Sequence, residues 1–322
     1  MKQETLARLV VLALAGVASI PLISGPHTPL LHARLAEEGG WTPDVLHAEA
    51  GEPFALRLTS DDVLHGFGVG HTDIEPVLVA PGTVTDVTLT FDQPGTYTYY
   101  CTVWCGLNHW RMRGIIVVEG ETPSTAPPEP PLYVQLAIDI DAPHPADVTP
   151  AVRPDAANAP DAAVEFSFEQ YAATSPAQLF AEFSRQPGLK DLTDAQRWNL
   201  VAALWAGQTS PAALVEGEAI FRQECAACHG QLGGGDGLYA EALAEAGEAA
   251  MDELAGTHDM MIQAPPDWQD PAVLLGASPA LLHGKMLRGG MGTGMPMWGA
   301  LYTDAQLWNV VAYLYTFQLN SP

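Results

Sequence analysis

The chain has 322 residues and a formal net charge of −25, with 38 Asp and Glu residues against 13 Lys and Arg residues. This charge excludes nucleic acid as a partner held through its phosphates, and it favours basic partners at low salt. The length allows two small domains with a good deal of sequence left over.

The N-terminal segment, residues 1–34, predicts an export or anchoring signal. An uncharged stretch of 23 residues, Leu9 to Leu31, follows Lys2 and Arg8. Its core has the length of a signal-peptide h-region, but the whole stretch is long enough to span a bilayer. We expect an uncleaved single anchor in the cell membrane, with a cleaved signal peptide as the alternative. In either case the rest of the chain lies on the extracytoplasmic, periplasmic side.

A compact set of soft metal ligands lies between Cys101 and Met112, in the sequence CTVWCGLNHWRM. Thiolate, imidazole and thioether ligands together favour copper, and the thioether argues against structural zinc. Two cysteines separated by three residues can place both sulfurs between two copper ions. Each ion then needs its own imidazole, one from His109 and one from upstream, where His65 is the best candidate and His71 its rival. A disulfide or two core cysteines are the alternatives for the pair.

Residues 41–118 resemble the binuclear CuA domain of subunit II of haem-copper oxidases. The resemblance covers the upstream histidine, the turn in FDQPGTYTYYC, the C-x3-C-x3-H-x2-M loop and the strand 114–118. It implies an all-β cupredoxin fold, a Greek-key sandwich, over residues 35–120. It also implies that the cysteines bridge the coppers, that His65 and His109 are terminal ligands, and that Met112 and the backbone carbonyl of Val103 are weak axial ligands. Many members of the family carry glutamate at the position of Val103 and use it for magnesium, so the magnesium site is not expected here.

The middle of the chain predicts two segments without cofactors. Residues 121–165 are rich in proline and alanine, which is typical of an extended, semi-rigid linker, although YVQLAIDID inside them alternates like a strand. Residues 166–211 predict a docked helical segment. Within it, LTDAQRWNLVAALW at 192–205 parallels YTDAQLWNVVAYLY at 302–315. The earlier copy is either a remnant of a second cytochrome or simply a similar helix, and we favour the latter.

The second pair of cysteines lies in ECAACHG, where Cys225 and Cys228 can form thioethers to haem and His229 can be the proximal iron ligand. The alternative is a C-x-x-C redox or zinc motif. Around this motif, residues 212–322 resemble an all-α class I cytochrome c, in which a helix with Gly217 and Phe221 crosses a C-terminal helix.

That resemblance implies a distal methionine directly before a proline, which is Met295 in GTGMPMWG, and it suggests that Trp268 reaches a haem propionate. Met291 and Met297 are the rivals for the distal position, followed by the histidines His258 and His283.

The whole chain resembles subunit II of a haem-copper cytochrome c oxidase with a fused cytochrome c. One covalently bound haem c and the binuclear CuA centre are the implied cofactors, and no catalytic residue is expected in this electron-transfer subunit. The implied route runs from a basic soluble cytochrome or cupredoxin donor to haem c, to CuA and to a membrane-embedded catalytic subunit. Trp41, Trp104 and Trp110 are candidates for the electron path, with packing as the alternative. The competing functions are a nitric oxide reductase subunit, a donor to nitrous oxide reductase, or a tethered periplasmic carrier.

Overall fold

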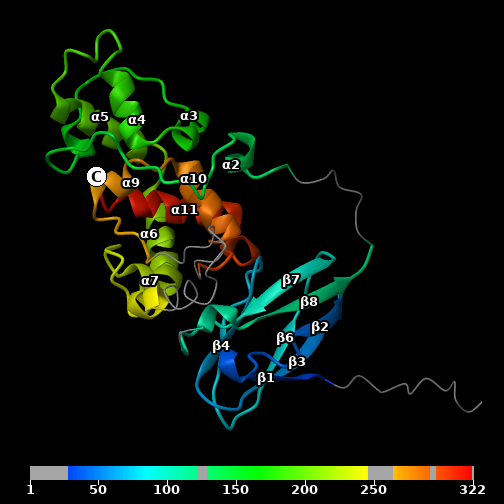
Figure 1. Cartoon of the computed structure of the whole chain (residues 1–322). Coiled ribbons are helices and arrows are strands. Elements are labelled where there is room, and N and C mark those ends of the chain that lie inside the picture. Colours follow the sequence, from blue (N-terminus) through cyan, green and yellow to red (C-terminus); the bar gives the residue numbers. More distant parts are fainter. Residues whose placement is uncertain (1–27, 107, 122–128, 246–263, 291–294, 321–322) are drawn as a thin grey trace, which may run out of the picture.

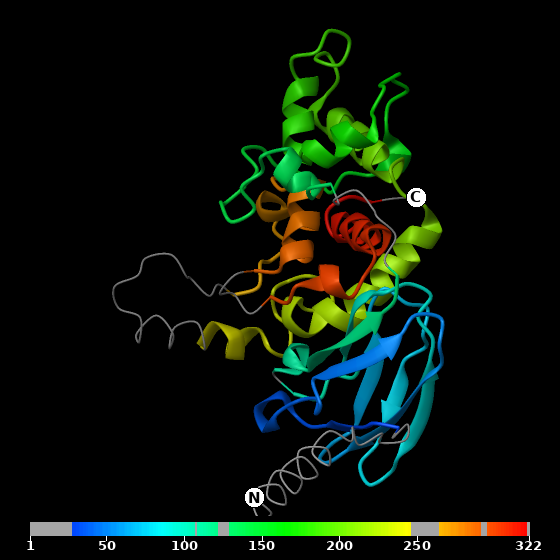
Figure 2. The ribbon, with the colours of Figure 1, turned by 90° about the vertical axis from the view of Figure 1, so that its right-hand side faces the viewer.

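The computed structural model describes residues 28–106, 108–121, 129–245, 264–290 and 295–320. A strand-rich unit and a helix-rich unit follow one another along the chain (Figure 1). A turned view shows the sandwich and the helices in contact along one side (Figure 2).

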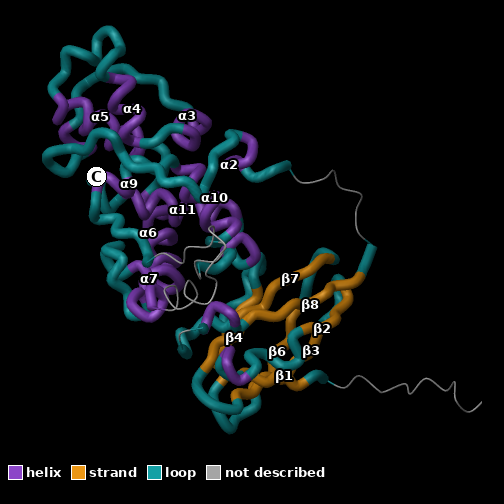
Figure 3. The backbone as a smooth tube through the Cα atoms, in the orientation of Figure 1, coloured by secondary structure: helices purple, strands orange, loops and turns teal. Residues whose placement is uncertain are grey.

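Residues 30–119 form a β-sandwich, as the colouring by secondary structure shows (Figure 3). Its sheets have the strand orders β1-β3-β6 and β2-β8-β7-β4-β5, with parallel pairing only of β1 with β3 and of β2 with β8 among the described strands. The fold class expected from the resemblance, a cupredoxin-like sandwich followed by helices, is confirmed. The strands are β1 (Leu30–Ala33), β2 (Val45–Glu49), β3 (Phe54–Ser60), β4 (His65–Val69), β5 (Val77–Val79), β6 (Thr85–Leu89), β7 (Gly95–Tyr100) and β8 (Arg113–Glu119), with the 3-10 turns η1 (Ala36–Glu38) and η2 (His109–Arg111).

Alternating side chains explain how the sandwich closes. In β8, Ile116 and Val118 are buried while their neighbours face outward, which is the pattern of a strand with one face on the core. Phe67 and Tyr99 fill the centre, with ring centroids 5.7 Å apart. The Tyr99 hydroxyl donates to the carbonyl oxygen of Pro43 at 2.6 Å, so this buried polar group is satisfied.

The boundary that we expected between the anchor and the sandwich, at residue 35, is wrong. Leu30–Ala33 pair in parallel with β3, and Leu31 and Ala33 are fully buried in the sandwich core. The last apolar residues of the N-terminal stretch are therefore sandwich residues, and Trp41 lies after the first strand. The rest of the expected anchor, residues 1–27, lies outside the described residues, and none of the helices that are described is long and apolar enough to span a bilayer.

The helical unit has one apolar core, which joins residues from Ile140 to Leu319. Its helices are α2 (Leu132–Gln135), α3 (Phe168–Ala173), α4 (Pro176–Phe183), α5 (Asp194–Ala206), α6 (Pro211–Ile220), α7 (Ala226–His229), α9 (Pro271–Leu274), α10 (Pro279–Arg288) and α11 (Asp304–Tyr315), with the π-helical turn η4 (Phe221–Cys225) and the 3-10 turns η3 (Ala156–Asn158) and η5 (Trp298–Ala300). Helices α6 and α11 cross so closely that a Cβ added to Gly217 would lie 2.1 Å from the carbonyl oxygen of Asn309. This is the glycine crossing that the cytochrome resemblance implies.

The expected free linker is shorter than predicted. From Leu132 onward the chain packs on the helical unit: Tyr133 lies against Gly284, Ile140 is buried, and Arg288 donates from Nη1 to Asp141 at 2.8 Å. The strand expected in this segment is also wrong, because Leu132–Gln135 form the short helix α2. Proline and alanine keep the backbone extended, but the few apolar side chains between them still find a core to cover.

The sequence repeat corresponds to a repeated pair of helices. Both α5 and α11 begin with a capping box, Thr193 with Gln196 and Thr303 with Gln306. Each also follows a helix, α4 or α10, that begins at the proline of a Ser-Pro-Ala sequence. The packing repeats as well, because Phe180 stacks on Trp198 at 4.5 Å and His283 stacks on Trp308 at 4.2 Å. The two copies differ in the connection, which runs from Phe183 to Asp194 in the first and is longer, from Arg288 to Asp304, in the second, where it carries Met295.

Candidate metal and haem sites

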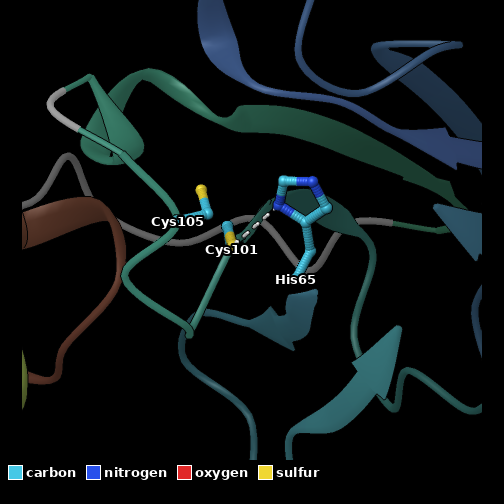
Figure 4. A group of neighbouring side chains, drawn as sticks. All are labelled: His65, Cys101 and Cys105. Atoms are coloured by element: carbon cyan, nitrogen blue, oxygen red, sulfur yellow. Dashed lines mark hydrogen bonds between the residues drawn. The ribbon is translucent and has the colours of Figure 1, made fainter. Parts of the chain in front are cut away.

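The predicted copper ligands converge in one buried place. The ligand atoms of His65, Cys101 and Cys105 all lie within 4.8 Å of one another, and Figure 4 shows the histidine of β4 facing the two cysteines of the loop after β7. Nδ1 of His65 is 3.7 Å from Sγ of Cys101, and Nδ1 of His109 is 3.7 Å from Sγ of Cys105.

The two expected axial groups lie at the same place. The Met112 sulfur is 3.3 Å from Sγ of Cys105, and the Val103 carbonyl oxygen is 3.2 Å from Sγ of Cys101. The six predicted donors thus form two sets, each with a sulfur, an imidazole nitrogen and a weak axial group. This donor chemistry fits copper.

Local backbone structure explains the convergence. Cys101 follows β7 directly and Met112 precedes β8, and the Cys101 N–H donates to the carbonyl oxygen of Met112 at 3.1 Å. Gly66 lets the loop close onto β4, because an added Cβ would lie 2.1 Å from the Thr102 hydroxyl. The Gly66 N–H also points at Sγ of Cys101, at 3.5 Å.

The two thiols behave as a proton-sharing pair. The hydrogen bond from Cys105 is the largest cause that lowers the pKa of Cys101, while the same bond and then burial raise the pKa of Cys105. Burial lowers the pKa of His65, but the hydrogen bonds with Cys101 and Asp62 outweigh it and raise the pKa above its ordinary value. A soft cation can take the place of the shared proton between the two sulfurs.

Asp62 is a site residue that the sequence analysis missed. Its carboxylate lies 2.7 Å from Nε2 of His65 and also accepts the backbone N–H groups of Leu35 and Val63, both at 2.6 Å. A carboxylate on the second nitrogen of a ligating imidazole fixes the ring tautomer and orientation. The only signal in the sequence was an acidic residue three positions before the histidine, which is too common to be diagnostic.

The predicted haem motif spans η4 and α7. Cys225 and Cys228 are free thiols, and burial lowers the pKa of His229 to about 4, so its imidazole is neutral and able to bind a metal. Nδ1 of His229 is buried and has no hydrogen-bond partner, and its ring stacks on Trp268 at 4.3 Å. Trp268 therefore contacts His229, the predicted proximal ligand, and the residues of the motif fit a covalently attached haem.

Among the candidates for the distal ligand, Met295 packs half-buried against the helical core. Met297 is 51% exposed, and His283 is buried against Trp308. Met291 and His258, the other candidates, lie outside the described residues. Of the candidates that are described, a half-buried sulfur beside the core suits a haem ligand best.

Trp104 joins the two units. Its indole N–H donates to the carbonyl oxygen of Gln223, two residues before Cys225, at 2.6 Å. On the other side its ring lies 4.5 Å from the ring of His109, and it also stacks on Tyr239 at 5.3 Å. One aromatic side chain therefore contacts both a predicted copper ligand and the haem-binding segment.

The other two candidate path residues lie elsewhere. Trp41 is buried in the sandwich, where its N–H donates to the carbonyl oxygen of Met112 at 3.1 Å and its ring lies 6.4 Å from that of His65. Trp110 lines a cavity of about 10 Å³ between the units and packs under the guanidinium of Arg111.

A buried polar contact, also missed by the sequence analysis, closes the interface beside this cavity. The Tyr302 hydroxyl donates to Glu224 at 2.8 Å, and burial raises the pKa of this carboxyl although the hydrogen bond lowers it. Burial also raises the pKa of Tyr100, which lines the same cavity, to about 12. Both groups therefore favour their neutral forms.

A sandwich with a soft sulfur and imidazole site, joined to a helical unit with a C-x-x-C-H motif, defines an electron-transfer protein. Comparisons with known families agree. Residues 45–120 match the family "Cytochrome C oxidase subunit II, periplasmic domain", and residues 214–318 match "Cytochrome c".

Individual proteins with similar sequences or structures were also found. A cytochrome c oxidase subunit 2 of Thermus thermophilus is 40% identical over 96 residues, which are 30% of this chain and 70% of that protein. A second protein of the same name, also from Thermus thermophilus, is 40% identical over 96 residues, here 56% of its length. A chain of a heme-copper terminal oxidase dimer has 24% identity, covers 37% of this chain and 97% of its own, and has a TM-score of 0.26, which adds no functional argument.

The chain belongs to the cytochrome c oxidase subunit 2 family. Its cytochrome c domain implies haem and its subunit II domain implies copper. It is a component of an oxidoreductase complex, with an electron-transfer role and an extracytoplasmic location.

Proposed function

We propose that this chain is subunit II of a cytochrome-fused haem-copper cytochrome c oxidase. It accepts single electrons at its haem unit, passes them to a binuclear CuA centre and delivers them to a membrane-embedded catalytic subunit. The observation that carries the proposal is the position of Trp104 between His109 and Gln223. The donor would be a basic soluble cytochrome or cupredoxin, since the chain carries a net charge of −25.

The proposed copper ligands are His65, Cys101, the Val103 carbonyl, Cys105, His109 and Met112, and the proposed haem residues are Cys225, Cys228, His229 and Met295. Haem and copper supply one-electron chemistry when bound. The chain holds both ligand sets on packed elements, buries His65, Cys101, His109 and Met112, and fixes the haem-binding segment against the copper loop. These features suit an electron-transfer centre, which works best when its geometry hardly changes.

The test of the proposal is purification of the native complex in mild detergent by a tag at the C-terminus. Oxygen, nitric oxide and nitrous oxide consumption are then measured in parallel with a reduced donor. We expect oxygen uptake with a co-purifying polytopic subunit. Uptake of a nitrogen oxide alone, or a lone chain without turnover, would replace the oxidase assignment with one of the competing functions.

Trp104 can be tested separately in the isolated chain. Trp104→Phe keeps an aromatic ring beside His109 but removes the N–H that binds Gln223. We expect electron transfer between the units, followed after flash reduction of the haem, to slow severalfold, while the copper EPR spectrum stays unchanged. Trp110→Phe is the matched control, and equal slowing in both variants would remove Trp104 from the path.

A further inference from the structure

One short segment of the helical unit, residues 297–301, is held by the sandwich. His71, in the loop after β4, donates from Nε2 to the carbonyl oxygen of Gly299 at 2.9 Å. Its backbone N–H donates to the carbonyl oxygen of Leu301 at 3.2 Å. The ring of the rival copper histidine is therefore used for a contact between the units.

Arg113, the first residue of β8, holds the same segment from a second place in the sandwich. Its Nη1 donates to the carbonyl oxygen of Met297 at 2.8 Å, and its guanidinium lies over the ring of Trp298, 5.6 Å from the centroid. Trp298 is buried at this contact. Side chains from one loop and one strand of the sandwich thus bind main-chain carbonyls two and four residues beyond Met295.

The backbone around His71 is shaped for this contact. A Cβ added to the preceding residue, Gly70, would lie 2.6 Å from the carbonyl oxygen of Ala300, so only glycine allows the approach. His71 itself has φ of 59°, a left-handed conformation that a residue with a side chain adopts only at a cost. The contacts with the helical unit hold it there.

On its other side the segment rests on the end of α10. Gly289, in a left-handed conformation with φ of 72°, would bring an added Cβ to 2.8 Å from the backbone of Met295 and Met297. Residues 295–301 are therefore held between α10 and the sandwich.

We propose that the sandwich positions the distal methionine of the haem, with His71 and Arg113 as the positioning residues that hold residues 295–301 in place. This inference rests on the proposed haem ligation by Met295. Contacts made only while this segment carries the sulfur toward the iron favour that arrangement over one in which the sulfur has left. Docking of the sandwich on the helical unit and ligation of the iron by Met295 are then coupled.

Exogenous imidazole measures this equilibrium, because it binds the ferric haem only when the methionine has left. Its apparent affinity is its intrinsic affinity multiplied by the open fraction. In the full-length, haem-loaded chain we expect His71→Ala to bind imidazole about fivefold more tightly, the factor that corresponds to the ~1 kcal/mol of one hydrogen bond. His71→Gln, whose amide can donate from a similar place, should return the affinity most of the way to that of the parent chain.

His47→Ala is the matched control, since it removes an exposed histidine of the same sandwich, on β2, that lies beside Glu119. Unchanged imidazole affinity in His71→Ala, an equal rise in His47→Ala, or a glutamine variant no better than alanine would overturn the positioning role. Loss of the copper EPR signal in His71→Ala would overturn it too, by making His71 a copper ligand. Met295→Ala tests the ligation alone: if imidazole affinity does not rise there, the distal assignment fails, whatever His71 does.

Discussion

Replacement of Gly70 by alanine is the sharpest perturbation of the contact between the two units. The new Cβ would lie 2.6 Å from the carbonyl oxygen of Ala300 and 2.8 Å from Cα of Leu301. To reach an ordinary contact of 3.4 Å, the backbones must separate by roughly 0.8 Å, the difference between 3.4 and 2.6. The bond from Nε2 of His71, now 2.9 Å, would stretch to about 3.7 Å and be lost.

The lost hydrogen bonds make the open form of the interface between the sandwich and the helical unit measurably more populated. Two hydrogen bonds at about 1 kcal/mol each and residual strain of up to ~1 kcal/mol disfavour the docked arrangement by about 2–3 kcal/mol. The population of the open form should therefore rise roughly 30- to 150-fold.

Hydrogen exchange followed by mass spectrometry measures that population. We expect the amide of residue 71 and the amides of residues 297–302 to exchange faster in Gly70→Ala by about that factor. Gly207→Ala is the control, because an added Cβ there meets nothing closer than 3.4 Å and the residue is in the right-handed region. Equal protection in the two variants would refute the close approach of the units.

Three further outcomes follow from single contacts. Asp62→Asn removes the carboxylate that orients His65, so copper affinity in a competitive titration should fall about 10- to 100-fold. Asp61 is the neighbouring residue but binds His32 and Arg34, so Asp61→Asn should leave the copper affinity unchanged. Burial raises the pKa of Glu224 in the folded chain above 4.5. Its contribution to stability is therefore complete below that pH and is lost as the pH rises through the folded pKa. The free energy of unfolding measured in urea should fall with pH in this way, and Glu224→Gln should remove the fall. Gly217→Ala drives a Cβ into the backbone of α11 and should cost at least about 1–3 kcal/mol in the free energy of unfolding, and a cost no larger than that of Gly207→Ala would contradict the helix crossing.

The sequence predicted best what is encoded locally. The loop from Cys101 to Met112 places its donors within one turn between two strands, and only His65 had to be brought in by the fold. The haem motif is local in the same way. The helix crossing at Gly217 was implied by the resemblance to class I cytochrome c, and the structure shows the close approach of the two backbones there.

The rest depends on contacts between residues far apart in the chain. The bond between His71 and Gly299 spans 228 positions, and no pattern around either residue indicates it. Asp62 is one acidic residue among 38 Asp and Glu, and only its distance to His65 gives it a role. The packing of Ile140 could not be predicted for a different reason. A proline-rich composition predicts an extended backbone, and it does so equally whether that backbone is free in solvent or packs on a core.

The central claim is that one chain holds a binuclear copper centre and a haem c in two units that Trp104 joins. The most direct test is EPR of the purified chain, loaded with haem and copper, together with flash reduction of the haem. We predict a multi-line mixed-valence copper signal that Cys105→Ser abolishes, and copper reduction that is independent of protein concentration. A single-copper signal, or a rate that rises with concentration, would contradict the account.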